Sequence, residues 1–484
     1  MRRITGLRLP LAHDETQLRA AVCAAFGVPD ATLLSYTVFR RAWDARKKSD
    51  ISLVYTIDAE LAGEVSAGEP TPDVGYKFVA QAKAPPRLRP IVIGTGPCGI
   101  FAALVLAQMG FAPMILERGK VVRERTKDTW GLWRKGVLNP ESNVQFGEGG
   151  AGTFSDGKLY SQIKDPNHLG RKVLTEFVEA GAPGEILYVA KPHIGTFRLV
   201  GMVETLRAKI EALGGEYRFG AKVSDIEIVD GAVQAVVLES GERIETRHVV
   251  LAIGHSARDT FAMLHQRGVF MEAKPFSVGF RIEHPQSMID KYRFGSFAGN
   301  PILGAADYKL VHHAGNGRSV YSFCMCPGGT VVAATSEPGR VVTNGMSQYS
   351  RNERNANAGI VVGISPQDYP GDVLAGVEFQ RRWESAAFVA GGGSYAAPGQ
   401  LVGDFLAAKP SKAFGEVLPS YKPGVKLTNL ASCLPDYAIA AIREALPAFD
   451  RQIKGFARPD AVLTGVETRT SAPLRITRGR DFQS

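Results

Sequence analysis

The chain has 484 residues, too many for one compact core, so two or three domains are expected. Hydrophobic residues at 45% and charged residues at 22% exclude a disordered protein, and no apolar run approaches the ~18–20 residues that span a membrane. Five cysteines argue against a disulfide framework, and a net charge of +9 suits anionic small molecules as well as nucleic acid, so we expect a soluble, cytoplasmic protein without membrane contact.

Residues 1–63 have the pattern of a small βαββ appendage. The expected elements are a strand at 3–9, a helix at 14–26 and two strands at 34–39 and 51–57. The basic run 40–48 between the last two strands predicts a solvated hairpin loop, with a phosphate or nucleic-acid contact as the alternative. Residues 64–89 are rich in Pro, Gly and Ala and predict a linker.

A stretch that begins near residue 90 predicts a dinucleotide-binding unit. A β-branched strand leads into a glycine-rich turn and a helix of small residues, and a second strand ends on an acidic residue. In such a turn the first glycine permits the sharp reversal, the second lets a pyrophosphate approach the backbone, and the third lets helix and strand pack closely. The segments are the strand 91–93, the glycines Gly94, Gly96 and Gly99, the helix 100–108 and the strand 114–116.

Glu117 follows the second strand, where a carboxylate can accept hydrogen bonds from an adenosine ribose. Its charge would repel a ribose 2′-phosphate, so the pattern predicts FAD or NAD rather than NADP. A glycine-rich turn of another α/β protein is the alternative, but the strand, the helix and the acidic terminus all agree with the nucleotide interpretation. No second turn of this kind, with a strand before it and a helix after it, occurs in the sequence.

The remainder of residues 90–260 continues a Rossmann-like domain. A glycine-rich loop at 145–159 indicates that the backbone approaches something flat or anionic. A helix is expected at 198–213, followed by the strands of an antiparallel meander at 222–229, 232–238 and 243–246 and by an apolar strand at 248–253.

This order of elements resembles the plan of glutathione-reductase-type FAD proteins. The sequence is more specifically similar to uncharacterised bacterial FAD-dependent dehydrogenases, which are single-Rossmann flavoproteins, over most of residues 30–478. The motifs that carry the resemblance are IGTGPCGIFAALVLAQMGFAPMILERG, GEGGAGTFSDGKL, KPHIGT, LAIGHSARDT, YSFCMCPGGTVV, VAGGGSYAAPGQLVGDFL and LTGVETRTSAPLRI. It implies an α/β fold: a Rossmann-like FAD-binding domain with a β-meander, an inserted α+β substrate domain at 261–451, and a segment at 452–484 that returns to the FAD domain.

The resemblance also implies FAD as the cofactor and a set of contacts to it. The glycine turn and Glu117 would hold the ADP half, the loop 149–153 would lie against the pyrophosphate and ring, and Val223 would offer its backbone to the adenine. The predicted contacts are Gly94, Gly96, Pro97, Gly99, Glu117, Arg118, Gly149, Gly150, Gly152, Thr153, Val223 and Gly254. Relatives usually continue into a glycine-rich segment that closes over the flavin, whereas this chain ends at Ser484, so a truncated product or weakened flavin binding is expected.

Four residues are candidates for catalysis. Cys324 and Cys326 would fall on one face of a strand with Cα atoms about 6.6 Å apart, so a disulfide between them needs a bulge. A flavin-coupled dithiol is one interpretation, and small core residues beside the ring are the other. His255 either faces the flavin edge or merely ends a strand, and Lys158 either polarises the flavin pyrimidine or steadies an anionic substrate. No metal site is expected, because the two thiols lack further ligands at suitable spacing.

Two arginines complete the candidate set. Arg258 is placed to face the flavin edge, and Arg469 either meets an anionic substrate or flavin phosphate or lies on the surface. We therefore predict a FAD-dependent oxidoreductase that transfers hydride or electrons between a reduced donor, with NAD(P)H as a candidate, and an unidentified small-molecule substrate. The alternatives are a flavin-dependent protein that modifies RNA or another nucleic acid, which the basic run would favour, and a non-catalytic FAD-binding module.

Overall fold

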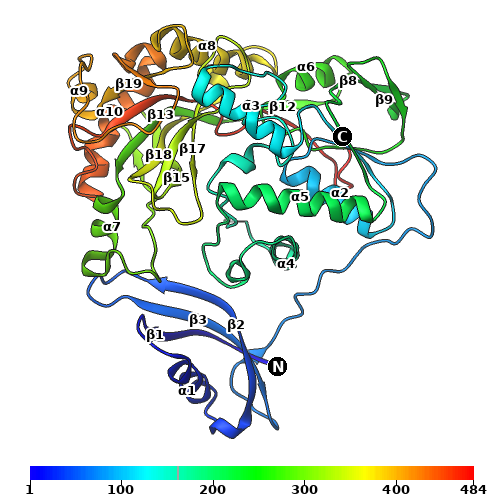
Figure 1. Cartoon of the computed structure of the whole chain (residues 1–484), viewed down its shortest axis with the longest axis vertical. Helices are drawn as coiled ribbons and strands as arrows, with labels where there is room; N and C mark the ends of the chain where they lie inside the picture. Colours follow the sequence, from blue (N-terminus) through cyan, green and yellow to red (C-terminus); the bar gives the residue numbers. More distant parts are fainter. Residues whose placement is uncertain (161–162) are drawn as a thin grey trace.

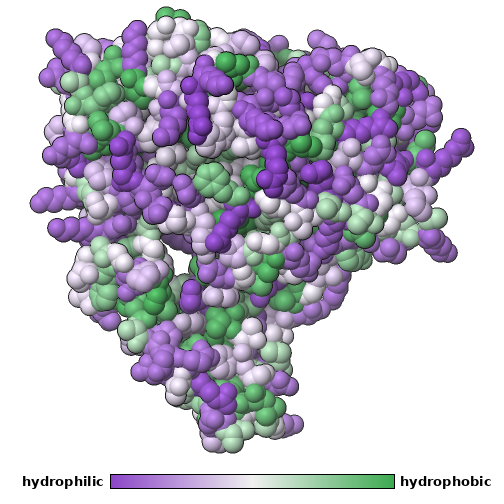
Figure 2. Space-filling model, in the orientation of Figure 1, coloured by the Kyte–Doolittle hydropathy of each residue, from purple (hydrophilic) through white to green (hydrophobic). Residues whose placement is uncertain are grey.

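The computed structural model describes residues 1–160 and 163–484 and has a mixed α/β fold with three regions (Figure 1). A small N-terminal unit projects from the rest of the molecule, and a long extended connection leads from it to a parallel sheet. A larger, mostly antiparallel sheet lies beside the parallel one. Among the described residues, no helix is both long enough and apolar enough to cross a membrane. Hydrophilic side chains cover most of the face drawn in Figure 2, and the hydrophobic patches between them are small.

The N-terminal unit contains the strand, helix and two strands that the sequence predicts. Its elements are β1 (Arg2–Pro10), α1 (Glu15–Phe26), β2 (Leu33–Asp44) and β3 (Ser52–Leu61), with the short β4 (Glu69–Pro70) added from the linker. The strands form an antiparallel sheet in the order β2-β3-β1-β4. Asp14 and Gln17 form a capping box at the start of α1, and Gly27 ends that helix in a left-handed conformation.

The sequence predicted a hairpin loop over the whole basic run 40–48, but only part of this run is a loop. Strand β2 continues to Asp44, so the hairpin loop covers only residues 45–51. The strand is longer because Arg41 lies against another part of the chain: its backbone N–H donates to the Tyr188 carbonyl at 2.7 Å, and its guanidinium lies 5.2 Å from the Tyr188 ring centroid. Part of the predicted nucleic-acid surface is thus an internal contact.

The second region is built on a four-stranded parallel sheet in the order β11-β5-β6-β7. Its strands are β5 (Ile91–Ile93), β6 (Met114–Glu117), β7 (Glu216–Phe219) and β11 (Val249–Leu251). The accompanying helices are α2 (Pro97–Gln108), α3 (Val122–Lys135), α4 (Leu169–Glu179), α5 (Thr196–Ala212) and α6 (Arg258–Gln266). A separate meander consists of β8 (Val223–Val229), β9 (Ala232–Leu238) and β10 (Arg243–Glu245). The predicted strands, helices, meander and returning strand are present, but the sequence analysis missed β7, the edge strand of the parallel sheet between α5 and the meander.

The third region is a seven-stranded sheet in the order β14-β15-β18-β13-β21-β19-β20. Its strands are β13 (Phe276–Pro285), β14 (Val311–His313), β15 (Ser319–Cys326), β18 (Asn355–Ile364), β19 (Ala397–Leu401), β20 (Val425–Leu427) and β21 (Val462–Glu467). The other elements are β16 (Gly329–Ala333), β17 (Thr343–Ser347), α7 (Gln286–Phe294), α8 (Ala375–Ala390), α9 (Val402–Leu406) and α10 (Asp436–Gln452).

The segment 452–484 was expected to return to the FAD-binding domain, and only its last strand does so. Strand β21 lies in the seven-stranded sheet between β13 and β19, where all of its residues are buried. Strand β22 (Leu474–Ile476) instead pairs with β12 (Met271–Ala273), beside the parallel sheet. The chain therefore crosses from the larger sheet to the parallel sheet between residues 467 and 474.

Candidate functional site

A cavity of about 480 Å³ opens at the edge of the parallel sheet where β5, β6 and β11 end. Parallel strands bring their carboxyl ends to one edge, and ligands of open α/β sheets bind in the crevice outside that edge. The wall comes from the glycine turn, the start of α2 and β8, the loop after β11 and the segment 472–476. Sequence-predicted residues in the wall are Gly94, Gly96, Pro97, Glu117, Arg118, Gly150, Gly152, Val223, Gly254 and His255.

The glycines of the turn differ in what surrounds them. A Cβ atom on Gly94 would lie 2.5 Å from the Ala252 carbonyl oxygen, and one on Gly99 would lie 1.9 Å from the carbonyl oxygen of Gly94. A Cβ atom on Gly96 would meet only the Cα of Gly150, at 3.8 Å. Gly94 and Gly99 are therefore needed by the fold itself, whereas Gly96 leaves open space in the cavity.

The N-terminus of α2 faces this space without a cap. Gly96 is the N-cap residue, no side chain caps the helix, and its first turn contains no acidic residue. Pro97 at the first helical position has no N–H to satisfy. The uncapped N–H groups and the positive end of the helix dipole form a site suited to phosphate.

Glu117 is 5% exposed and accepts four hydrogen bonds from the protein itself. One carboxylate oxygen accepts from the backbone N–H and the hydroxyl of Thr95, at 3.0 and 2.6 Å. The other accepts from the N–H groups of Gly119 and Gly147, at 2.9 and 3.0 Å. Glu117 therefore joins the glycine turn to the loop around Gly147, a structural role that the motif did not predict, and its contact with a ribose stays a prediction.

Arg125 of α3 supports the glycine-rich loop from behind, and the sequence analysis missed it. Its fully buried guanidinium donates to the carbonyls of Asn143, Val144 and Glu148 at 2.7–2.8 Å. Burial lowers the pKa of Arg125 to about 10, so it stays charged at neutral pH. The sequence does contain a signal for the burial of Arg125. It lies at helical spacing from Val122, Thr129 and Leu132, which share the buried face of α3.

His255 lies in the cavity wall beside Ser256, with its Nδ1 2.9 Å from the Ser256 hydroxyl. Burial, together with the charges of Arg469 and Arg258, lowers the pKa of His255 to about 4. The imidazole is therefore neutral at pH 7. In that state it can donate or accept a hydrogen bond but carries no charge toward a ligand.

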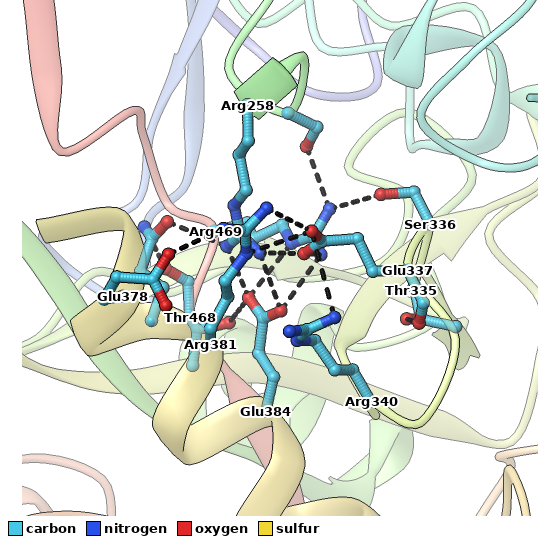
Figure 3. A network of polar contacts seen from close by, with 12 residues as sticks. Arg258, Thr335, Ser336, Glu337, Arg340, Glu378, Arg381, Glu384, Thr468 and Arg469 are labelled. Carbon is cyan, nitrogen blue, oxygen red and sulfur yellow. Dashed lines mark hydrogen bonds and ion pairs between the residues drawn. The ribbon is translucent and has the colours of Figure 1, made fainter. Parts of the chain in front are cut away.

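Arg258 and Arg469 do not face the cavity, and both are buried in a polar network behind it (Figure 3). Both guanidiniums bind the fully buried carboxylate of Glu384 in α8, with distances from 2.7 to 3.1 Å. Arg469 also donates to the Ser256 hydroxyl at 3.2 Å. The surface alternative for Arg469 is therefore wrong, because the buried side chain joins α8 to the segment after β21. The contacts of the two arginines with a flavin or substrate stay predictions.

Besides these two arginines, six predicted residues lie outside the cavity wall. Gly99 packs behind the turn, and Gly149 and Thr153 face each other within the loop, where a Cβ atom on Gly149 would lie 2.1 Å from the Thr153 hydroxyl. Lys158, Cys324 and Cys326 gather in a second cluster at β15. Among the described residues, no group of three or more His, Cys, Asp or Glu side chains is arranged to hold a metal ion.

Comparisons with known proteins agree with a nucleotide site. Residues 275–470 match the family described as "FAD-dependent protein, C-terminal domain-like", and residues 1–60 match a domain of unknown function, DUF8436. An uncharacterized protein of Clostridium beijerinckii is 45% identical over 492 residues, which cover 100% of this chain and 92% of that protein. The chain belongs to the same family as this Clostridium protein, and its residues 275–470 belong to the family of FAD-dependent C-terminal domains. Its cofactor is FAD, as the sequence predicted.

Two solved structures match parts of the chain at low similarity. THI4 of Thermovibrio ammonificans is 18% identical, with a TM-score of 0.27 and coverage of 38% of this chain and 64% of that protein. A mutant of the halogenase PltM in complex with FAD is 13% identical, with a TM-score of 0.33 and coverage of 61% of this chain and 55% of that protein. The chain thus spans less than two thirds of the length of these solved proteins.

The residues around the cavity fit FAD. The open side of Gly96 would admit a pyrophosphate, and the uncapped start of α2 would bind its charge. Lys222 and Arg475 also line the wall, but both form ion pairs with carboxylates of the chain. Apolar side chains from Leu116, Val223 and Leu474 also line the cavity, and they suit an adenine.

Proposed function

We propose that this family member is a FAD-dependent oxidoreductase that transfers hydride or electrons between a reduced donor and a small-molecule substrate. The observation that supports this most is the uncapped N-terminus of α2 opposite Gly96 and Gly150, in the crevice of a parallel sheet. Bound FAD would supply the two-electron chemistry, and the protein would supply binding, orientation and electrostatics.

We assign the binding roles by position in the wall. Gly96, Pro97 and the loop residues Gly150 and Gly152 would hold the pyrophosphate, because they surround the helix N-terminus. Val223, at the start of β8, would contact the adenine. Arg118 forms ion pairs with Glu141 and Asp259 at 2.6 and 2.8 Å and would therefore orient the wall beside Glu117 rather than carry free positive charge. This arrangement is the one expected of a glutathione-reductase-type FAD site.

His255 is the candidate for a direct role beside the reacting part of the ligand. It lies after Gly254 in the wall and is held by Ser256, which is itself bound to Gln145 at 3.2 Å and to Arg469. A neutral imidazole held in this way would donate or accept one hydrogen bond at a defined place. Lys158 and the cysteines lie away from the described wall, so we give them no role in binding the adenine half.

The electron donor can be tested on the purified, FAD-loaded protein under anaerobic conditions. We expect NADH or NADPH to bleach the flavin absorbance, and the ratio of the two rates will identify the donor. The free flavin and the protein reduced by dithionite serve as controls. Reduction by dithionite but by neither nicotinamide would refute NAD(P)H as the donor and would favour the non-catalytic FAD-binding module.

A further inference from the structure

Strand β15 is irregular at its two cysteines. Its pairing with β18 runs from Phe323 opposite Gly359 to Cys326 opposite Asn357, so β15 has one more residue than its partner over this stretch. Cys324, the residue in the bulge, has a φ of 42°. A non-glycine residue in the left-handed region costs about 1–3 kcal/mol, and such residues cluster at functional sites. The bulge is also the distortion that a disulfide between these cysteines requires.

The two cysteines are in contact across the bulge. The Cys326 thiol donates to the Cys324 carbonyl oxygen at 3.3 Å. Cys326 is fully buried, whereas Cys324 is half-buried. Of the pair, Cys324 is therefore the thiol that a reagent can reach.

Three cations lie around the thiols, and two of them share one carboxylate. Arg281 of β13 forms an ion pair with Glu467 of β21. Asp156 is bound by the Nε and one terminal nitrogen of Arg351, and the ammonium of Lys158 lies 3.6 Å from one of its oxygens. Lys158 otherwise donates to the Met325 carbonyl, in the bulge itself.

The groups around the two thiols determine which thiol loses its proton more easily. Its interaction with the Cys326 thiol, together with Lys158 and Arg281, holds the pKa of Cys324 well below its usual value, against the effect of burial. The same interaction and burial raise the pKa of Cys326. Tyr308 and Glu467 are the other titratable groups in this environment, and burial raises the pKa of both.

We propose that Cys324 and Cys326 are a redox-active dithiol, in which Lys158 stabilises the Cys324 thiolate and a small disulfide is the oxidant. The Cys324 thiolate attacks one sulfur of the disulfide, which forms a mixed disulfide and releases a thiolate. That thiolate takes the proton of Cys326. The Cys326 sulfur then attacks Cys324, which forms the internal disulfide and releases the second thiolate. Two electrons pass from the dithiol to the small disulfide.

This site uses only side chains of the chain, so it does not depend on which donor reduces the flavin. Access is provided at Lys158, whose side chain is 21% exposed, and at half-buried Cys324. Lys158 also lies at the end of the glycine-rich loop that includes Gly150 and Gly152 of the cavity wall. Lys158 therefore connects the dithiol to the loop that forms part of the cavity wall.

The first test follows disulfide formation in the full, FAD-loaded protein. The probe is a series of oxidised and reduced glutathione mixtures, followed by alkylation and mass spectrometry of the peptides. We expect an internal disulfide between Cys324 and Cys326 as the mixture becomes oxidising. Cys326→Ser should instead accumulate glutathione on Cys324, and Cys324→Ser should form neither product. Free alkylation of both thiols in every mixture, or glutathione on Cys326 alone, would overturn the proposal.

The second test keeps both cysteines and measures the thiolate. The rate at which iodoacetamide alkylates Cys324 should fall about tenfold at pH 7 in Lys158→Gln, and the midpoint of its pH profile should rise. Lys164→Gln removes an exposed lysine of the same loop and should leave the rate and midpoint unchanged. Cys433, whose pKa burial raises to about 11, is the internal reference. Equal rates in the two lysine variants would overturn the role of Lys158.

Discussion

At the scale of single residues, the glycine turn separates positions that the fold needs from one that a ligand needs. Gly99 belongs to the first kind, because a Cβ atom there would overlap the Gly94 carbonyl and lie 3.3 Å from the Ala252 side chain. The close packing of helix on strand that the third glycine predicts is thereby confirmed.

We expect Gly99→Ala to destabilise the protein by about 1–3 kcal/mol, because α2 must move away from β5 and β11. The measurement is the urea midpoint of the apoprotein. Gly201→Ala in α5 is the matched control: no atom lies within 4 Å of its Cβ position, so it should be neutral or stabilising by up to about 1 kcal/mol. Similar midpoints in the two variants would contradict the packing argument.

His284 of β13 gives a prediction for pH. It is fully buried, its Nε2 donates to the Phe456 carbonyl at 2.7 Å, and burial lowers its pKa to about 4. An unfolded histidine has a pKa of about 6.5, so between pH 6.5 and 4 the unfolded state binds the extra proton. Stability due to this residue is therefore present above pH 6.5 and is lost as the pH falls toward 4.

His284→Gln keeps a donor for the Phe456 carbonyl and removes the titration. We expect the free energy of unfolding of the variant to depend less steeply on pH over this interval, by up to about 1.4 kcal/mol per pH unit. Urea unfolding at several pH values measures the slope. His265→Gln, at an exposed position in α6, is the comparison and should leave the slope unchanged.

At the scale of elements, one buried carboxylate fastens three segments together. Glu384 of α8 binds Arg258 at the start of α6 and Arg469 after β21, and burial opposes its ionisation while both arginines hold its pKa well below the ordinary value (Figure 3). The network therefore couples the larger sheet to the wall that contains His255.

Glu384→Gln would leave two guanidiniums buried side by side with only the partly exposed Glu337 as a shared anion. We expect a loss of about 3–5 kcal/mol in the free energy of unfolding. Glu378→Gln, which removes an exposed partner of Arg381 in the same helix, should cost less than about 1 kcal/mol. Chemical denaturation of both variants decides the matter, and equal effects would show that Glu384 does not support the network.

The elements near the glycine motif were predictable because local signals fix them. The apolar strand 91–93, the glycines, Pro97 and the meander turns each specify local backbone geometry, and the structure has elements at all of these places. The extension of β2 to Asp44 was not predictable, because it depends on a contact between Arg41 and Tyr188, two residues that are far apart in the sequence.

At the scale of the whole molecule, the sequence does not predict to which sheet a given strand belongs. The pattern of 462–467 is an apolar strand in either sheet, and only the pairing of β21 with β13 and β19 decides the question. That pairing also determines where Arg469 lies. The segment after β21 passes Glu384 before β22 pairs with β12, so Arg469 binds Glu384. A motif predicts the cofactor, but the partners of a charged side chain depend on the assembled fold.

The central claim is that FAD binds in the crevice beside Gly96. Its most direct test is the titration of apoprotein with FAD, for the unaltered chain and for Gly96→Ala, which has room for the new methyl group in the empty cavity. We predict one FAD per chain, an unchanged urea midpoint in the variant and an affinity for FAD at least about tenfold lower, which corresponds to about 1.4 kcal/mol. Failure of the unaltered chain to bind FAD, or equal affinities in both proteins, would contradict the account.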